Sequence, residues 1–201
     1  MSANEAGIFY PLIFQPHGRF LHLKYLELVI VGPRNYGFGY QYTYLVTFLK
    51  ASPVLETFIL HVEESAKEPY PLVINPKYLK NHLLPEHCHQ SIKHVTVTGF
   101  CHTQELVELI FYILENATSL QCLTLDNRIR GFEDLVACIT QDAGTQSYPK
   151  SYWDAYCSYV AIRKYIIGRV PSSVELKIPV VPPDEIISRL SKVESELLKS
   201  P

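Results

Sequence analysis

Residues 91–125 read SIKHVTVTGFCHTQELVELIFYILENATSLQCLTL, and this stretch decides the fold. Residues 92–97 and 120–125 share the pattern apolar-x-x-apolar-x-apolar, whose final positions alternate as in a strand buried on one face. Between them lies an amphipathic run with Glu105 in its first turn, which favours a helix through the backbone dipole. The stretch therefore predicts strand, helix, strand, with one helix face formed by Leu106, Leu109, Ile110, Ile113 and Leu114.

The same strand pattern recurs on both sides of this stretch. Copies begin at residues 23, 55, 92 and 120, which are 32, 37 and 28 residues apart, and a weaker copy begins at 173. Strand-helix-strand units need parallel pairing, and units that cannot bury their own apolar face must stack on neighbours. We expect a leucine-rich-repeat-like α/β solenoid with a parallel sheet. The alternative is a compact α/β domain whose strands are similar by coincidence.

Helices and loops are expected between these strands. The run 44–51 predicts a helix that stops before Pro53, and a second apolar stripe, at Tyr159, Ile162, Ile166 and Val170, continues to Pro171. Proline, glycine and charge predict irregular insertions over 63–90 and 127–152, with short helices at 76–84 and 132–140.

The chain is predicted to have three parts: an N-terminal segment over 1–20, the repeat domain over 21–178, and a linker with a helix over 179–201. Asp184 is a good N-cap for a C-terminal helix that runs to about residue 199. Its a/d-like seam consists of Ile186, Leu190, Val193 and Leu197. Docking on the array or mobility is favoured for this helix over docking on a partner, because two heptads are marginally stable alone.

Composition predicts an ordinary globular protein in the cytoplasm or nucleus. Of the 201 residues, 47% are hydrophobic and 19% are charged, and the formal net charge of -2 gives no long-range attraction for nucleic acid or an anionic membrane. No apolar run approaches membrane-span length, and the N-terminus lacks a signal-peptide pattern. Reduced thiols are expected at Cys88, Cys101, Cys122, Cys138 and Cys157.

No motif predicts catalysis, a cofactor or a metal. Residues 86–89 (EHCH), with Cys101-His102 a dozen residues on, contain metal-ligand types, but the ligands are adjacent rather than in spaced pairs, so a solvated loop is the favoured interpretation. His94 and Cys122 occupy matching outward positions of neighbouring strands. Their proximity is more simply explained by the repeat than by a nucleophile pair.

Two further features have structural explanations. Asn116 begins a glycosylation-type tripeptide, but its position predicts a role in ending the helix. A tyrosine run suits base stacking only if lysine or arginine is interleaved, so we predict a loop packed on the edge of the array for Tyr36, Tyr40, Tyr42 and Tyr44.

Several of these residues also carry a family resemblance. Pro85-Glu86, the run at 92–100 ending in Gly99-Phe100, the run LENA at 114–117 and the run at 120–125 resemble the C-terminal, FBD-type part of plant F-box leucine-rich-repeat proteins, especially grass members. The resemblance spans residues 21–178. It implies a non-enzymatic adaptor that presents a protein target for ubiquitination.

The same resemblance limits the expected partners. Members of that family begin with an F-box that binds Skp1, and residues 1–20 do not supply one. A link to Skp1 and cullin is therefore expected only if an F-box is provided elsewhere. The chain is then a C-terminal fragment, a truncated gene product, or a divergent paralogue without a ligase link.

The two x positions nearest the centre of each strand are expected to point outward. They define a predicted protein-binding surface of mixed polar and aromatic residues. Its members are Tyr25, Glu27, Thr57, Ile59, His94, Thr96, Cys122, Thr124, Glu175 and Lys177.

Overall fold

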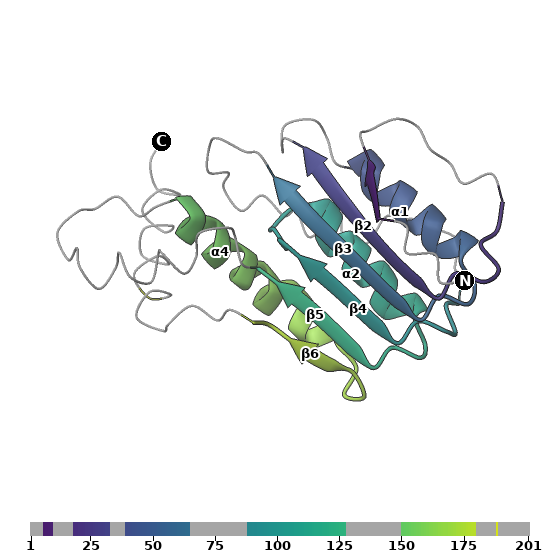
Figure 1. Cartoon of the computed structure of the whole chain (residues 1–201). Coiled ribbons are helices and arrows are strands. Elements are labelled where there is room, and N and C mark those ends of the chain that lie inside the picture. The colour runs from purple at the N-terminus through teal and green to yellow at the C-terminus, as the bar shows by residue number, and fades with distance from the viewer. Residues whose placement is uncertain are drawn as a thin grey trace.

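A computed structural model describes residues 6–9, 18–32, 39–64, 88–127, 150–179 and Ser188. Its sheet has six parallel strands in chain order (Figure 1). A doubly wound sheet would reverse its strand order at a switch point, whereas this order is that of stacked repeats. The predicted leucine-rich-repeat-like parallel fold is confirmed, with strands β1 (Ala6–Phe9), β2 (Tyr25–Gly32), β3 (Thr57–Glu64), β4 (His94–Thr98), β5 (Cys122–Asp126) and β6 (Glu175–Lys177).

Strands β2 to β6 each begin two residues after the start of the sequence pattern. The first apolar residue of the pattern lies in the preceding turn, where Leu55, Ile92 and Leu120 are buried. These residues belong to the core although they lie outside the strands. The first position of the pattern is therefore apolar because it is buried, not because it pairs in the sheet. Strands β2 and β3 also run beyond the pattern, to Gly32 and Glu64.

Strand β1 was not predicted. It pairs in parallel with β2, with Ala6 opposite Glu27 and Phe9 opposite Ile30. Four residues, including a glycine, are too few to show the alternation that reveals a strand. The sheet therefore extends into the N-terminal segment that the sequence analysis had set apart from the repeats.

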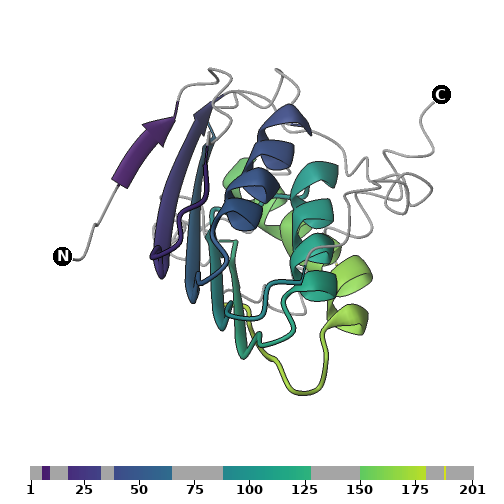
Figure 2. The same cartoon turned by 90° about the vertical axis from the view of Figure 1, so that its right-hand side faces the viewer.

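The core lies between the sheet and the helices α1 (Gly39–Ala51) and α2 (Gln104–Asn116), which Figure 2 shows on one side of the sheet. Helix α2 is buried over most of its surface because α1 and the segment Ile162–Ile166 contact it as well as the strands. The strands contribute two inward rows that are continuous in register: Leu26, Phe58, Val95, Leu123 and Leu176, then Leu28, Leu60, Val97 and Leu125.

Helix α1 begins earlier than the sequence predicted, at Gly39 rather than Tyr44. Tyr40, Tyr42 and Tyr44 therefore lie in a helix, and the prediction of a loop for them is wrong; Tyr36 lies outside the described residues. Their every-second-residue spacing does not follow a helical period, which hid the first turn. The helix ends at Ala51, two residues before Pro53, as expected.

The last helical region changes its winding along its length. Helix α4 (Lys150–Ala161) continues as a π-helical turn over Ile162–Ile166 and a 3₁₀ turn over Ile167–Arg169. Ile162 and Ile166 of the predicted stripe are fully buried. The helices predicted at 76–84 and 132–140, and the C-terminal helix except for Ser188, lie outside the described residues. Within the described part of the chain, no helix is both long and apolar enough to span a membrane.

One glycine has a specific structural role. Gly99 follows β4 with a φ of +68°, a left-handed conformation that side chains rarely adopt. A Cβ at this position would overlap the backbone carbonyl oxygen of Val62 in β3. The turn also allows the Phe100 N–H to donate to the Asp126 carbonyl, 2.8 Å away. Gly99 therefore fixes how the carboxyl ends of β3, β4 and β5 meet.

Candidate functional site

The face of the sheet opposite α1 and α2 is called the outer face here, and all ten residues of the predicted surface lie on it. Their strand positions alternate with the inward rows, and none of the ten is buried. The backbone register aligns them in two rows across the five strands β2 to β6. The first row is Tyr25, Thr57, His94, Cys122 and Glu175, and the second is Glu27, Ile59, Thr96, Thr124 and Lys177.

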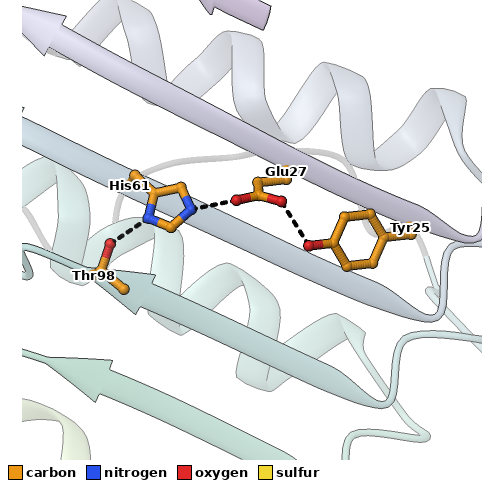
Figure 3. Close-up of polar contacts among 4 residues, drawn as sticks. All are labelled: Tyr25, Glu27, His61 and Thr98. Atoms are coloured by element: carbon orange, nitrogen blue, oxygen red, sulfur yellow. Dashed lines mark hydrogen bonds and ion pairs between the residues drawn. The ribbon is translucent and has the colours of Figure 1, made fainter. Parts of the chain in front are cut away.

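A chain of hydrogen bonds connects three strands on this face (Figure 3). The Tyr25 hydroxyl donates to Glu27 Oε2 at 2.6 Å, and Glu27 Oε1 lies 2.7 Å from His61 Nε2. On the other side of the imidazole, Nδ1 lies 2.7 Å from Thr98 Oγ1. An ionised carboxylate only accepts, so Nε2 carries the proton towards Glu27, and in neutral His61 the Thr98 hydroxyl donates to Nδ1. Four side chains from β2, β3 and β4 are thus held in fixed orientations.

These contacts also set the ionisation of two groups. The hydrogen bond from Tyr25, followed by the one from His61, holds the pKa of Glu27 below its ordinary value. The bond to Glu27, with smaller effects of desolvation and of the carboxylate charge, raises the pKa of the Tyr25 phenol. Glu27 is therefore a carboxylate at neutral pH and Tyr25 a neutral donor, which gives this part of the outer face a fixed negative charge.

His61 and Thr98 were missing from the predicted surface. They belong to a third row on the outer face, in which Val29, His61, Thr98 and Asp126 are aligned in register. The sequence pattern ends at Leu60 and Val97, one residue short of each. Extending the alternation by one more outward position would have identified both residues.

The opposite edge of the outer face carries a different set of groups. Lys177 Nζ lies 3.2 Å from Glu175 Oε2, and both side chains are more than half exposed. The hydrogen bond to Glu175 is the largest cause of a raised Lys177 pKa, with Cys122 also contributing. The half-buried Cys122 has its thiol 3.9 Å from Thr124 Oγ1. It lies next to His94 in register, so the expected neighbour relation is present in the backbone.

At the amino-terminal edge of the sheet, Glu56 lies between two lysines. Its carboxylate contacts Lys24 Nζ at 3.0 Å and Lys93 Nζ at 2.9 Å. These three residues precede β3, β2 and β4, where their backbones also form a hydrogen-bonded ladder. The hydrogen bonds from Lys93 and Lys24, with the charges of both, lower the pKa of Glu56 from 4.5 to about 2. Glu56 thus connects three repeats electrostatically.

A pH dependence of stability follows from Glu56. Because its folded-state pKa is depressed, its contribution is complete above about pH 4.5 and disappears as the pH falls towards 2. We expect wild type to lose more stability than Glu56→Gln over that interval, and the difference to shrink in high salt because the group is exposed. Urea midpoints of both proteins across this pH range test the expectation, and parallel pH profiles would contradict it.

The residues considered as metal ligands have separate contacts. His89 is buried, with Nε2 2.8 Å from the Tyr112 hydroxyl, whereas the exposed Cys88 has its thiol 3.7 Å from Thr118 Oγ1. Burial raises the pKa of Tyr112 to about 12, so its hydroxyl stays protonated. Residues 86 and 87 lie outside the described part, and among the described residues no group of three potential ligands is placed to hold a metal.

The remaining predicted features are the end of α2 and the cysteines. Asn116 is the last residue of α2, and its side-chain amide donates to the Tyr112 carbonyl at 2.8 Å, so its side chain folds back onto the last turn of the helix. The four described cysteines, Cys88, Cys101, Cys122 and Cys157, form no disulfide within the described part of the chain, and Cys138 lies outside it.

A family model described as the leucine-rich-repeat domain of At1g61320/AtMIF1 matches residues 11–182, which include strands β2 to β6. The chain belongs to this leucine-rich-repeat family. The repeats recognised from the pattern at 23, 55, 92, 120 and 173 are thus those of a leucine-rich-repeat domain, a type of domain that serves in protein interaction. No curated protein and no solved structure shows a significant match to this chain.

Proposed function

We propose that this leucine-rich-repeat domain is a protein-recognition module that binds its target through the outer face. The observation that carries the proposal is the pair of unbroken rows, in which ten side chains from five strands are aligned in register and accessible to solvent. A parallel sheet backed by buried helices is a rigid scaffold. Ordering this surface on binding would therefore cost little free energy.

The chemistry of the rows supports a protein partner. The outward neighbours of the half-buried Ile59 are polar: Thr57 and His61 lie along β3, and Glu27 and Thr96 lie opposite it on β2 and β4. An apolar centre with a hydrogen-bonding surround is the arrangement found at the energetic centres of protein interfaces. A phosphate backbone would require several lysines or arginines, whereas the two rows contain only Lys177.

We further propose a connection to ubiquitination, which the resemblance to F-box proteins supports. In this role the domain selects the target, and an F-box supplied elsewhere recruits Skp1 and cullin. The alternative is a non-catalytic paralogue that binds a partner without any ligase. Affinity purification with and without proteasome inhibition separates the two, because recovery of Skp1 and cullin supports the first and a target recovered without either supports the second.

The outer face as a binding surface has its own test. We expect the double variant His94→Ala with Thr124→Ala, one residue from each row, to weaken binding of the recovered target about tenfold or more. The control pair, Arg163→Ala with Ser172→Ala, removes exposed side chains beyond α4 and is expected to bind normally. Titrations of purified target with each variant provide the measurement. Equal affinities for both pairs, with folding unchanged, would remove the surface assignment.

A further inference from the structure

The outer face is more acidic than the chain as a whole. Its solvent-accessible strand positions in the described part hold three carboxyl groups, on Glu27, Glu63 and Glu175, and one ammonium group, on Lys177, whereas Asp126 is buried. With histidines neutral, three negative charges and one positive charge give these few positions a formal -2, as much as the entire chain carries. The single ammonium is already paired with Glu175 at 3.2 Å. This excess of negative charge attracts a positively charged ligand.

Two described lysines that precede β2 and β4 lie at the amino-terminal edge and are engaged there. Lys24 and Lys93 both contact Glu56, at 3.0 and 2.9 Å, one position before the first row begins. They therefore do not neutralise Glu27, whose two nearest polar contacts are the Tyr25 hydroxyl and the His61 ring.

Tyr25 and Glu27 together have the groups that a cationic side chain requires. The Tyr25 side chain is among the few large hydrophobic ones that are exposed, at 38%, and an exposed aromatic ring attracts a cation to its face. The Glu27 carboxylate has four lone-pair positions, of which Tyr25 and His61 occupy two, so two remain for a further donor within the described part of the chain. Ile59, next to Glu27 in register, offers an apolar surface for an aliphatic stem.

We propose that the outer face recognises a basic segment of a protein partner, with an arginine or lysine side chain seated on Tyr25 and Glu27. This inference rests on the proposed function and specifies the chemistry of the target. The hydrogen bonds from Tyr25 and His61 hold the carboxylate in place before the partner binds. Binding therefore does not carry the entropy cost of ordering this side chain. A guanidinium meets this geometry best, because it combines bidentate donation to a carboxylate with stacking on an aromatic ring.

The probe is a random dodecapeptide phage library selected on the immobilised full chain, followed by fluorescence anisotropy with the selected peptides. We expect the selected peptides to be enriched in arginine or lysine. Glu27→Gln, which keeps the shape and removes the charge, is expected to weaken them about 10- to 100-fold, the value of a charge-assisted hydrogen bond. Glu115→Gln removes the same charge from the exposed end of α2, away from the outer face, and is expected to weaken binding less than about threefold.

A double-mutant cycle localises the contact. Replacing the basic residue of the peptide with glutamine should reduce its affinity for the wild-type protein. The same replacement should reduce its affinity for Glu27→Gln only slightly, because the contact is already lost there. Equal losses in Glu27→Gln and Glu115→Gln would overturn the Tyr25–Glu27 site, because they would indicate a general effect of charge.

A third variant, Thr96→Arg, adds a bulky side chain at the centre of the second row and distinguishes the possible failures. If the selected peptides are acidic or neutral and Thr96→Arg abolishes their binding, the basic-segment inference is overturned but the outer face remains the binding surface. Peptides that bind Thr96→Arg as well as wild type, or a library without enrichment, would count against both proposals.

Discussion

Gly99→Ala is expected to lower the free energy of unfolding by about 2–5 kcal/mol, one of the two largest effects that we predict for a single substitution. About 1–2 kcal/mol comes from placing a side chain in the left-handed region, where Gly99 has a φ of +68°. A further 1–3 kcal/mol, roughly, comes from displacing backbone, because the new Cβ meets the Val62 carbonyl oxygen rather than a movable side chain. Urea denaturation of the purified chain measures the loss.

Gly168→Ala is the matched control for this prediction. Gly168 lies in the 3₁₀ turn Ile167–Arg169, and a Cβ there meets no atom within 4 Å. We expect no loss of stability, and at most a gain of about 1 kcal/mol from the reduced entropy of the unfolded chain. If both variants unfold at the same urea concentration, the close approach of Gly99 to β3 does not contribute to stability.

Phe58→Ala is expected to cost about 3–5 kcal/mol, the range for removing a large aromatic side chain from a core. Phe58 is fully buried, and it lies in β3 between Leu26 of β2 and Val95 of β4. Helices behind the sheet are held in place by their packing against each other and the strands, so the cavity can collapse only in part. The loss should appear as a reduced urea midpoint and as reduced yield of folded protein.

The next residue along the same strand provides the control. Ile59 points to the outer face and is half-buried, so Ile59→Ala should cost less than about 1.5 kcal/mol. It should nevertheless weaken the partner or the selected peptides, because Ile59 is the apolar centre of the surface. A variant Ile59→Ala that destabilises as strongly as Phe58→Ala would show that the two faces of β3 are not distinct.

Much of the fold is readable from the sequence because burial repeats with the strand period. Leu26 and Leu28 in β2 have counterparts at the same positions of β3, β4 and β5, and these inward rows revealed both the strands and their register. Strand β1 has no such pattern, and it depends on pairing with β2 rather than on its own four residues. The first turn of α1 was missed because its apolar residues do not follow a helical period.

The candidate site was only partly predictable for a related reason. Alternation indicates which residues point outward, but not which of them bond to each other across strands. The contact between Glu27 and His61 joins residues 34 positions apart and depends on the register of β2 with β3. Once the register is known, Glu27, His61 and Thr98 are neighbours on three adjacent strands, and their hydrogen bonds follow from donor and acceptor types.

The order of the strands in the sheet also sets the width of the outer face. Neighbouring strands of a sheet are about 4.8 Å apart, so the four gaps from β2 to β6 separate Tyr25 from Glu175 by roughly 19 Å. An extended peptide advances about 3.3 Å per residue, and about six residues would cross all five strands. A partner that contacts both ends of a row therefore needs a linear segment of that length or a folded surface at least as wide. A single side chain or a small metabolite would cover only one or two repeats.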